Sequence, residues 1–183
     1  MSYLVSKSQY IRKVLPEFLF YKRNVHNSIF SKQLEFVAFS TKNSKNYGEI
    51  LVRKSTVQYR EDYAGPILAI DLIKSKNINQ GLGTAMINFA KNYSKQNGCN
   101  GYLILRADAS LSPDRVPQIF YRKQGFSTFD DKTDTKMDEF IKNKSDATSK
   151  DFIVDIMHYP PLKEKKKLSF CEKLRRILND FFL

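Results

Sequence analysis

The sequence predicts one mixed α/β domain: a twisted, mostly antiparallel sheet of about six or seven strands flanked by helices. Three observations support this fold class. Short apolar runs separated by polar turns recur between residues 34 and 73, as in a series of antiparallel strands. The apolar run Ile67–Ile73 leads through a glycine turn into an amphipathic helix and a second run, which is a strand–helix–strand unit. The 183 residues, with 14 Phe and 10 Tyr, are enough for one full core.

The N-terminal thirty residues are the least regular part of the chain. We expect a strand near Tyr3–Val5, followed by one or two short helices up to about Ser31. The stretch Tyr10–Phe20 mixes apolar and basic residues. Pro16 starts or interrupts a helix there, because proline lacks an N–H donor.

Two strands and a turn come next. Leu34–Ser40 and Gly48–Val57 flank the polar stretch Lys42–Tyr47, and this order is typical of a hairpin. A Gly-Pro pair at 65–66 then marks a turn before the central strand, Ile67–Ile73.

A helix is predicted to begin at the glycine turn Gly81–Thr84 and to end near Asn97-Gly98, since glycine is common just after a helix C-terminus. Its apolar residues recur at the i, i+3, i+4 spacing of one buried face. They are Ala85, Met86, Phe89, Ala90 and Tyr93. The run Gly101–Ala107 then forms a buried strand parallel to the first, because a helix connects the two.

Helix and strand alternate again after this unit. Ser112 as N-cap and Pro113 at the first helical position predict a short helix through Lys123. A glycine ends this helix, and Phe126–Phe129 is expected to form a strand.

The last elements of the domain are a short helix at Thr135–Lys142 and a strand at Phe152–His158. Two consecutive prolines at 160–161 then close the domain. We therefore expect a domain over residues 1–158 and a separate C-terminal tail over residues 159–183.

The tail has a character of its own. It contains the basic run Lys163–Lys167 and the spacing Ser169-x-x-Glu172, which is a capping-box signature. An amphipathic helix is predicted from the apolar stripe Phe170, Leu174, Ile177, Leu178 and Phe181. The stripe is expected to pack on the domain or on a second copy of the chain, as in a homodimer. The alternative is a helix that binds a partner or a membrane surface, attracted to anionic lipid by its basic residues.

Charge and single residues narrow the class of protein. The net charge of +12 suits a nucleic acid, an acidic protein, anionic lipid or a phosphorylated cofactor, and equally an ordinary solvated surface. Cys99 and Cys171 lack metal-site spacing and are expected to be free thiols, so we expect no metal. His26 and His158 are expected to be surface or satisfied core histidines. Without a membrane-spanning run or a secretory h-region, the chain is expected to be cytoplasmic.

The two glycines of the central turn have a physical use. Because Gly81 and Gly83 lack Cβ atoms, the backbone there can approach a ligand closely. The first N–H groups of a helix lack intrahelical partners, and with the helix dipole they form a seat for phosphate. The alternative is a plain tight turn and helix start. The spacing is neither a dinucleotide-binding fingerprint nor a Walker loop.

Together with a second stretch, this turn resembles the Gcn5-related N-acetyltransferase family. The acyl-CoA motif of that family reads Gln/Arg-x-x-Gly-x-Gly/Ala between a strand and a helix, and Gly81 and Gly83 occupy its two small positions. A later family motif often reads Leu-Tyr-x-Lys-x-Gly-Phe, and Phe120–Phe126 matches it at Tyr, Lys, Gly and Phe. Two positions depart from the pattern: the Gln/Arg position is Ile78, and an Asn often found before the tyrosine is Asp114 here.

The resemblance implies a domain of that family's fold with acetyl-CoA as acyl donor. Backbone groups near Leu72 and Ile73 would pair with the pantetheine arm as an added β-strand does. Lys123 would meet a phosphate of the coenzyme, or it is an ordinary exposed lysine. The pyrophosphate would bind the backbone amides of Asn79, Gln80, Gly81, Leu82, Gly83 and Thr84.

The implied reaction is direct attack of a neutral amine on the thioester carbonyl, with protonation of the departing thiolate. Tyr121 stands where the family places its general acid; alternatively it is a half-buried aromatic. Asp71 is the one acidic residue inside the central strand, where an unpaired carboxylate is costly. It is a candidate general base, or it pairs with a neighbouring basic residue. Glu35, Glu49 and a water relay are the other candidates for the base.

We therefore expect an acetyl-CoA-dependent N-acetyltransferase. The acceptor is a small amine, a protein amine or an aminoacyl-tRNA, and the basic surface favours an acidic or nucleic-acid-borne acceptor. A longer acyl group is also compatible. The alternative is a non-catalytic module of the same fold that binds coenzyme A, or that docks on a partner or membrane through its C-terminal helix. A plain nucleic-acid-binding domain ranks last, because charge alone supports it.

Overall fold

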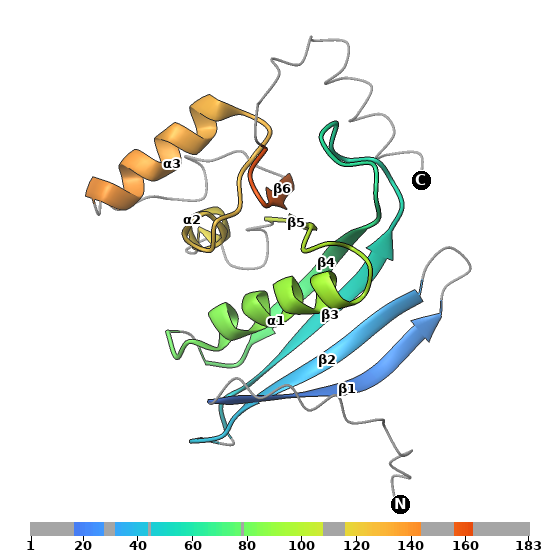
Figure 1. Ribbon diagram of the computed structural model, residues 1–183. Coiled ribbons are helices and arrows are strands. Elements are labelled where there is room, and N and C mark those ends of the chain that lie inside the picture. Colours follow the sequence, from blue (N-terminus) through green and yellow to red (C-terminus); the bar gives the residue numbers. More distant parts are fainter. Residues whose placement is uncertain are drawn as a thin grey trace, which may run out of the picture.

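In the part of the chain that the computed structural model describes, six strands form one sheet in chain order and three helices accompany it (Figure 1). The structure describes residues 17–27, 32–43, 45–77, 79–107, 116–143 and 156–162. Within these ranges, only β4 and β5 pair in parallel, and the other neighbouring strands are antiparallel. The prediction of a mixed, mostly antiparallel sheet with flanking helices is confirmed.

The strand β1 (Phe18–Asn27) lies where the sequence predicted short helices, so that prediction was wrong over this stretch. Phe18 and Phe20 alternate into the core with period two, and β1 pairs along its length with β2 (Lys32–Ser40). The basic residues between the aromatic ones hid this alternation. A register shift between Lys22 and Asn24 further disturbs the pattern. The strand expected near Tyr3–Val5 lies outside the described residues.

The next two strands follow the prediction closely. β2 and β3 (Tyr47–Ser55) form the expected hairpin, and β4 (Ile67–Ser75) runs two residues past its predicted end. Successive side chains of these strands point to opposite faces of the sheet. One face carries large apolar residues into the core, and the opposite face carries mostly polar residues.

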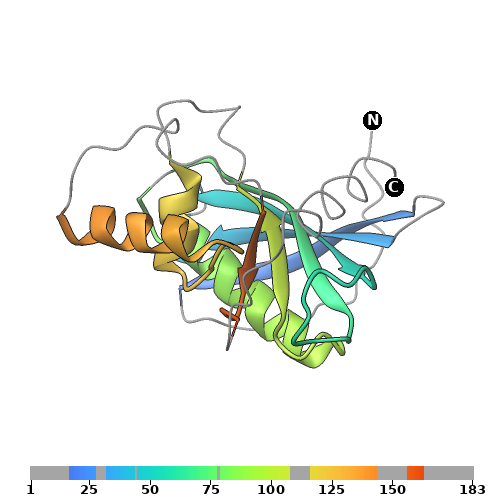
Figure 2. The same ribbon diagram turned by 90° about the horizontal axis from the view of Figure 1, so that it is seen from above.

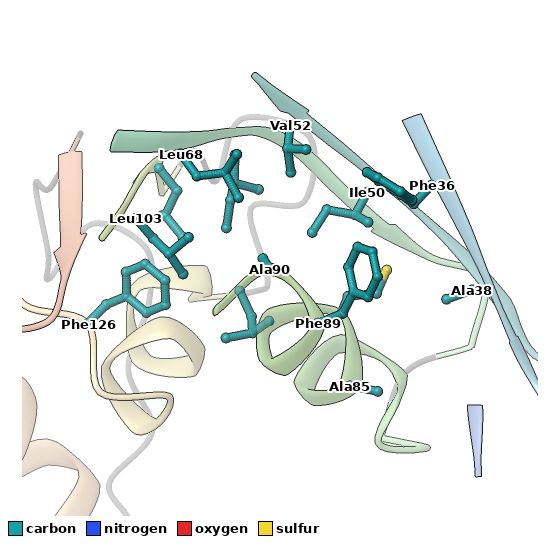
Figure 3. Packing of buried hydrophobic residues seen from close by; sticks show 14 of the residues in the cluster. Phe36, Ala38, Ile50, Val52, Leu68, Ala85, Phe89, Ala90, Leu103 and Phe126 are labelled. Carbon is teal, nitrogen blue, oxygen red and sulfur yellow. The ribbon is translucent and has the colours of Figure 1, made fainter. Parts of the chain in front are cut away.

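The helix α1 (Leu82–Gln96) packs its predicted apolar face on the inward side of the sheet (Figure 3). Phe89 stacks on Phe20, with ring centroids 4.3 Å apart, and contacts Phe36 edge to face at 4.8 Å. Burying one large apolar side chain contributes roughly 1.5–3 kcal/mol, which is why this stripe fixes the helix on the sheet. The helix ends at Gln96 with Asn97 as its C-cap, and Gly98 follows with φ 78°, close to the predicted end.

The C-terminal part of the domain consists of β5 (Leu103–Arg106), α2 (Pro117–Lys123), α3 (Asp131–Asn143) and β6 (Ile156–Tyr159). In both views α3 projects beyond the sheet, next to α2 (Figures 1 and 2). Buried residues of both helices join the same core as α1.

Two predictions in this part need correction. The helix α2 begins at Pro117, because Val116 has non-helical torsion angles (φ −113°, ψ 80°) and proline suits the first helical position. The predicted start at Ser112 and Pro113 lies outside the described residues.

The second correction concerns Phe126–Phe129, which form no strand, only a single bridge between Ser127 and His158. Side chains occupy the next backbone groups: Asp134 Oδ1 accepts from the Thr128 N–H at 2.8 Å, and His158 Nε2 lies 3.0 Å from the Thr128 oxygen. Asp130 then caps α3 by accepting from the Thr133 N–H at 3.1 Å, which is why α3 begins earlier than predicted.

The end of the chain is only partly described. β6 confirms the second half of the predicted last strand, and residues 151–155 lie outside the described ranges. The tail beyond residue 162, with its predicted amphipathic helix, also lies outside them. Among the described helices, none is both long and apolar enough to cross a membrane.

Candidate active site

Among the described residues, the strand β4 has a free edge over residues 71–75. On one side β4 pairs with β3 as far as Gly48↔Ser75, whereas on the other its pairing with β5 stops at Ile70↔Leu105. No described residue pairs with the β5 side of β4 beyond that point. The burial pattern changes at the same place, since residues 67–70 are buried and Asp71 and Leu72 are exposed. Backbone donors and acceptors are therefore available there for an added extended chain.

A bulge in β4 lies at the point where the two strands separate. Leu51 pairs with Leu72 and Val52 pairs with Ile70, so Asp71 is an extra residue without a cross-strand partner in β3. Its carboxylate accepts from Arg53 Nε at 3.0 Å and from Gln33 Nε2 at 3.0 Å. Of the two alternatives predicted for Asp71, the structure shows the pairing with a basic residue.

This pairing also affects Arg53. Burial alone would lower the pKa of the Arg53 guanidinium, but the hydrogen bond and negative charge of Asp71, together with Tyr59, outweigh burial and raise it. The neighbouring carboxylates are paired as well: Arg23 Nη1 lies 3.1 Å from Glu49 and 3.4 Å from Glu35. The carboxylates considered for the base thus all carry an arginine partner on this face.

The turn between β4 and α1 leads into a helix N-terminus without a side-chain cap. Asn79 (φ 60°) and Gly81 (φ 75°) both adopt left-handed torsion angles, which turn the chain sharply. The N–H of Ala85 makes the first intrahelical bond, to Gly81 at 2.9 Å. The preceding amides, 82–84, therefore have no intrahelical acceptor, and no acidic residue lies in the first turn. Ile78 lies outside the described residues.

Gly83 serves helix packing. A Cβ atom built on Gly83 would lie 3.1 Å from the Phe120 ring of α2, closer than most real contacts. The missing side chain lets α2 approach the first turn of α1. Residue 83 thus brings the two resembling motifs together in space.

Tyr121 lies on α2, beside Phe120, and its ring is packed against Phe120 and Phe126 at 5.2 and 5.9 Å between centroids. Burial raises the pKa of the Tyr121 phenol to about 12. No other described residue makes a hydrogen bond to its hydroxyl. The group therefore stays protonated over the whole neutral range, as a proton donor must.

The remaining candidates are less informative. Lys123 is exposed at the end of α2. His158 is fully buried, with Nδ1 3.1 Å from Arg60 Nη1 and Nε2 near a carbonyl, so the prediction of a satisfied core histidine is confirmed. The side chain of His26 lies outside the described residues. No group of three or more metal-ligating side chains occurs among the described residues.

Sequence reasoning missed two structural features of the candidate site. The bulge at Asp71 follows from pairing with β3, which no local pattern reports. Arg122 occupies a variable position of the resembling motif, yet it makes a two-pronged ion pair with Asp138 at 2.8 and 2.6 Å. The acidic spacing Asp134-x-x-x-Asp138, which begins one residue before the predicted helix Thr135–Lys142, was the available signal for an arginine partner.

Comparisons with known proteins add no relative: no family model, no curated protein and no solved structure matches this chain.

Proposed function

We propose that this chain is an acetyl-CoA-dependent N-acetyltransferase of the kind its motifs resemble. The observation that carries the proposal is the junction between the free edge of β4 at residues 71–75 and the uncapped N-terminus of α1. The ligand that suits such a junction is extended, has amide groups along its length and ends in a phosphate. Coenzyme A has this composition.

The free edge would hold the pantetheine arm. Residues 71–75 span roughly 16 Å at the usual rise of a strand, which suits an arm with two amide groups. Backbone groups near Leu72 and Ile73 would pair with these amides. The pyrophosphate would then reach the turn at residues 79–84, where the helix dipole and the amides without intrahelical acceptors favour an anion.

The chemical step would be direct transfer. The lone pair of a neutral amine attacks the thioester carbonyl, the carbon–sulfur bond breaks as the tetrahedral intermediate collapses, and the thiolate takes up a proton. Tyr121 would donate that proton or a hydrogen bond to the sulfur. A backbone N–H near the bulge would stabilise the oxyanion.

The general base is either a carboxylate on this face or a water molecule. Asp71 remains a candidate through its place at the bulge, but its two hydrogen bonds favour a role as a fixed anion that orders Arg53 and Gln33. Removal of the amine proton through water then becomes the better alternative. We propose a small amine, a protein amine or an aminoacyl-tRNA as acceptor.

One observation favours the alternative, a non-catalytic module that binds coenzyme A or docks on a partner. Asp71, Glu35 and Glu49 are all paired with arginine, so none of them stands ready to accept a proton. In that case no amine would be acetylated, whether the module binds coenzyme A or docks on a partner.

Calorimetric titration of the full-length protein with acetyl-CoA tests the proposal, with adenosine diphosphate and dephospho-coenzyme A as controls. We expect saturable binding of acetyl-CoA in the micromolar range and weaker binding of the nucleotide alone. An amine screen that measures thiol release then separates the enzyme from the non-catalytic module. A folded protein that does not bind acetyl-CoA would refute the enzyme and favour the module that docks on a partner.

A further inference from the structure

The helix α2, which carries Tyr121, is too short to be stable without neighbours. It has seven residues and no side-chain cap at its N-terminus. Isolated helices of this length are not stable in water, so tertiary contacts must hold α2 in place. One contact is the close approach of Phe120 to Gly83, and another is the hydrogen bond from Lys91 Nζ of α1 to the Gln124 oxygen at 2.7 Å.

Arg122 makes the most extensive of these contacts. Its Nε and Nη2 donate to the two Asp138 oxygens at 2.8 and 2.6 Å, and its Nη1 lies 3.3 Å from Asp134 Oδ2. The same Nη1 donates to the Phe126 oxygen at 3.2 Å and to Ser127 Oγ at 2.7 Å. The hydrogen bond to Asp138, against the opposing effect of burial, raises the pKa of the Arg122 guanidinium.

These partners are themselves held by the rest of the fold. Asp134 Oδ1 also accepts from the N–H and hydroxyl of Thr128, at 2.8 and 3.0 Å. Ser127 pairs with His158 of β6 through two backbone hydrogen bonds of 2.8 and 2.9 Å. A continuous set of contacts thus connects α2 through Arg122 and α3 to the sheet.

We infer that Arg122 is a positioning residue for Tyr121, and that α3 serves to hold Arg122 in place. The inference rests on the proposed function, in which the Tyr121 hydroxyl meets the coenzyme sulfur. Because no other described residue bonds to this hydroxyl, its place depends on how α2 is held. A planar guanidinium with two parallel bonds fixes orientation as well as distance.

The contacts of Arg122 also exclude a different role for it. An arginine one residue from Lys123 could be a ligand for a coenzyme phosphate. Its Nε, Nη1 and Nη2 are instead all bonded to carboxylates, a carbonyl and a hydroxyl within the protein. Its side chain is only 18% exposed.

Three substitutions test the inference in the full-length protein. Arg122→Met removes the two-pronged pair, Arg122→Lys keeps the charge without the fork, and Asp138→Asn weakens the pair from the exposed side. The control is Phe36→Leu, which loosens packing against Phe89 and Tyr93 of α1 and removes none of the Arg122 hydrogen bonds.

Two readouts are measured. We expect kcat to fall roughly ten- to hundredfold in Arg122→Met, with KM for acetyl-CoA within about twofold of the parent value. The loss of kcat should be smaller in Arg122→Lys and Asp138→Asn, and Phe36→Leu should keep its kcat.

The second readout is the ionisation of Tyr121, taken as the difference in tyrosinate absorbance between each variant and its Tyr121→Phe counterpart. Loosening α2 should admit water and lower the pKa of Tyr121 from about 12 toward about 10.

The outcomes distinguish the positioning role of Arg122 from the proposed acetyltransferase function. If Tyr121 ionises in Arg122→Met as in the parent protein, Arg122 does not position it, whatever the activity. An equal loss of kcat in Phe36→Leu would reduce the effect to general stability and also overturn the inference. If the parent protein binds no acetyl-CoA, the proposed function fails, and the titration still decides whether Arg122 holds Tyr121. Should Arg122→Met fail to fold, Asp138→Asn gives the same test.

Discussion

Tyr121 is the residue on which the proposed chemistry depends most, and its burial sets a pH dependence. A general acid acts in its protonated form, and this form persists up to a pKa of about 12. We therefore expect the wild-type rate to show no falling limb from this phenol below strongly alkaline pH. In Tyr121→Phe, kcat should fall by about 10²-fold or more, with little change in acetyl-CoA affinity. Steady-state rates and calorimetric titration across the alkaline range measure both.

A matched control for this substitution is Tyr47→Phe, which removes an exposed hydroxyl far from α2 in sequence. It should leave kcat unchanged. A falling limb near pH 10 that disappears in Tyr121→Phe would show that water reaches the phenol, against the burial described here. Equal activity of Tyr121→Phe at every pH would remove Tyr121 from the acid role.

At the residue scale, the sequence did not determine which partners the candidate residues contact. Gly81 and Gly83 were both predicted to open the backbone to a ligand, and only Gly81 has the left-handed torsion angle that requires glycine. Gly83 is needed for the approach of α2, which depends on a residue 37 positions later. Similarly, the partner of Asp71 was unknown because Arg53 and Gln33 come from other strands.

At the scale of elements, the N-terminus of α1 is the feature that a charge can test most directly. Gln80 is exposed just before the helix. Gln80→Glu keeps nearly the same side-chain shape. Its negative charge should interact favourably with the helix dipole and stabilise the helix by about 0.3–1 kcal/mol. The same charge should repel the pyrophosphate. We therefore expect unchanged or slightly raised thermal stability together with weaker binding of acetyl-CoA.

The control for Gln80→Glu is Asn88→Asp, an exposed position about two turns further along the same helix. It adds the same charge to the protein, so any general effect of net charge appears in both variants. The difference between their affinities for acetyl-CoA, measured by calorimetry at low salt, reports on the turn itself. Equal affinities would argue against a phosphate site at this helix terminus.

Elements with a clear period were predicted correctly, and those defined by distant partners were not. The stripe of α1 and the alternation of β2 and β3 each follow from local patterns. In contrast, β1 reads locally as a mixed apolar and basic stretch, and pairing with β2 makes it a strand. The residues 126–129 are apolar enough for a strand, yet side chains of Asp134 and His158 take up the backbone groups of Thr128.

At the scale of the whole molecule, a buried arginine connects the β3–β4 loop with the end of the sheet. Arg60 is 1% exposed and makes a two-pronged pair with Asp62 at 2.8 and 2.6 Å. It also donates to the Pro160 oxygen and lies 4.8 Å from the Tyr102 ring. His158, which contacts Arg60, also contacts the Thr128 oxygen through Nε2. Thr128 follows Ser127, which accepts a hydrogen bond from Arg122. The loop, β6 and α2 are therefore parts of one connected polar network.

This network predicts how stability depends on pH. The hydrogen bond from Arg60, which outweighs burial, lowers the pKa of Asp62 below its ordinary value. Because the folded pKa is depressed, the stabilisation is present above the unfolded pKa, near 4, and is lost as pH falls through the folded one. Asp62→Asn should therefore lower the free energy of unfolding by about 1–3 kcal/mol at neutral pH, and by less at about pH 3.

Urea unfolding at both pH values measures this difference. The control is Glu17→Gln, which removes the exposed partner of Lys42. That control should change stability by less than about 1 kcal/mol. A loss in Asp62→Asn no greater than in Glu17→Gln would mean that the carbonyl groups, His158 and Tyr102 suffice to hold Arg60.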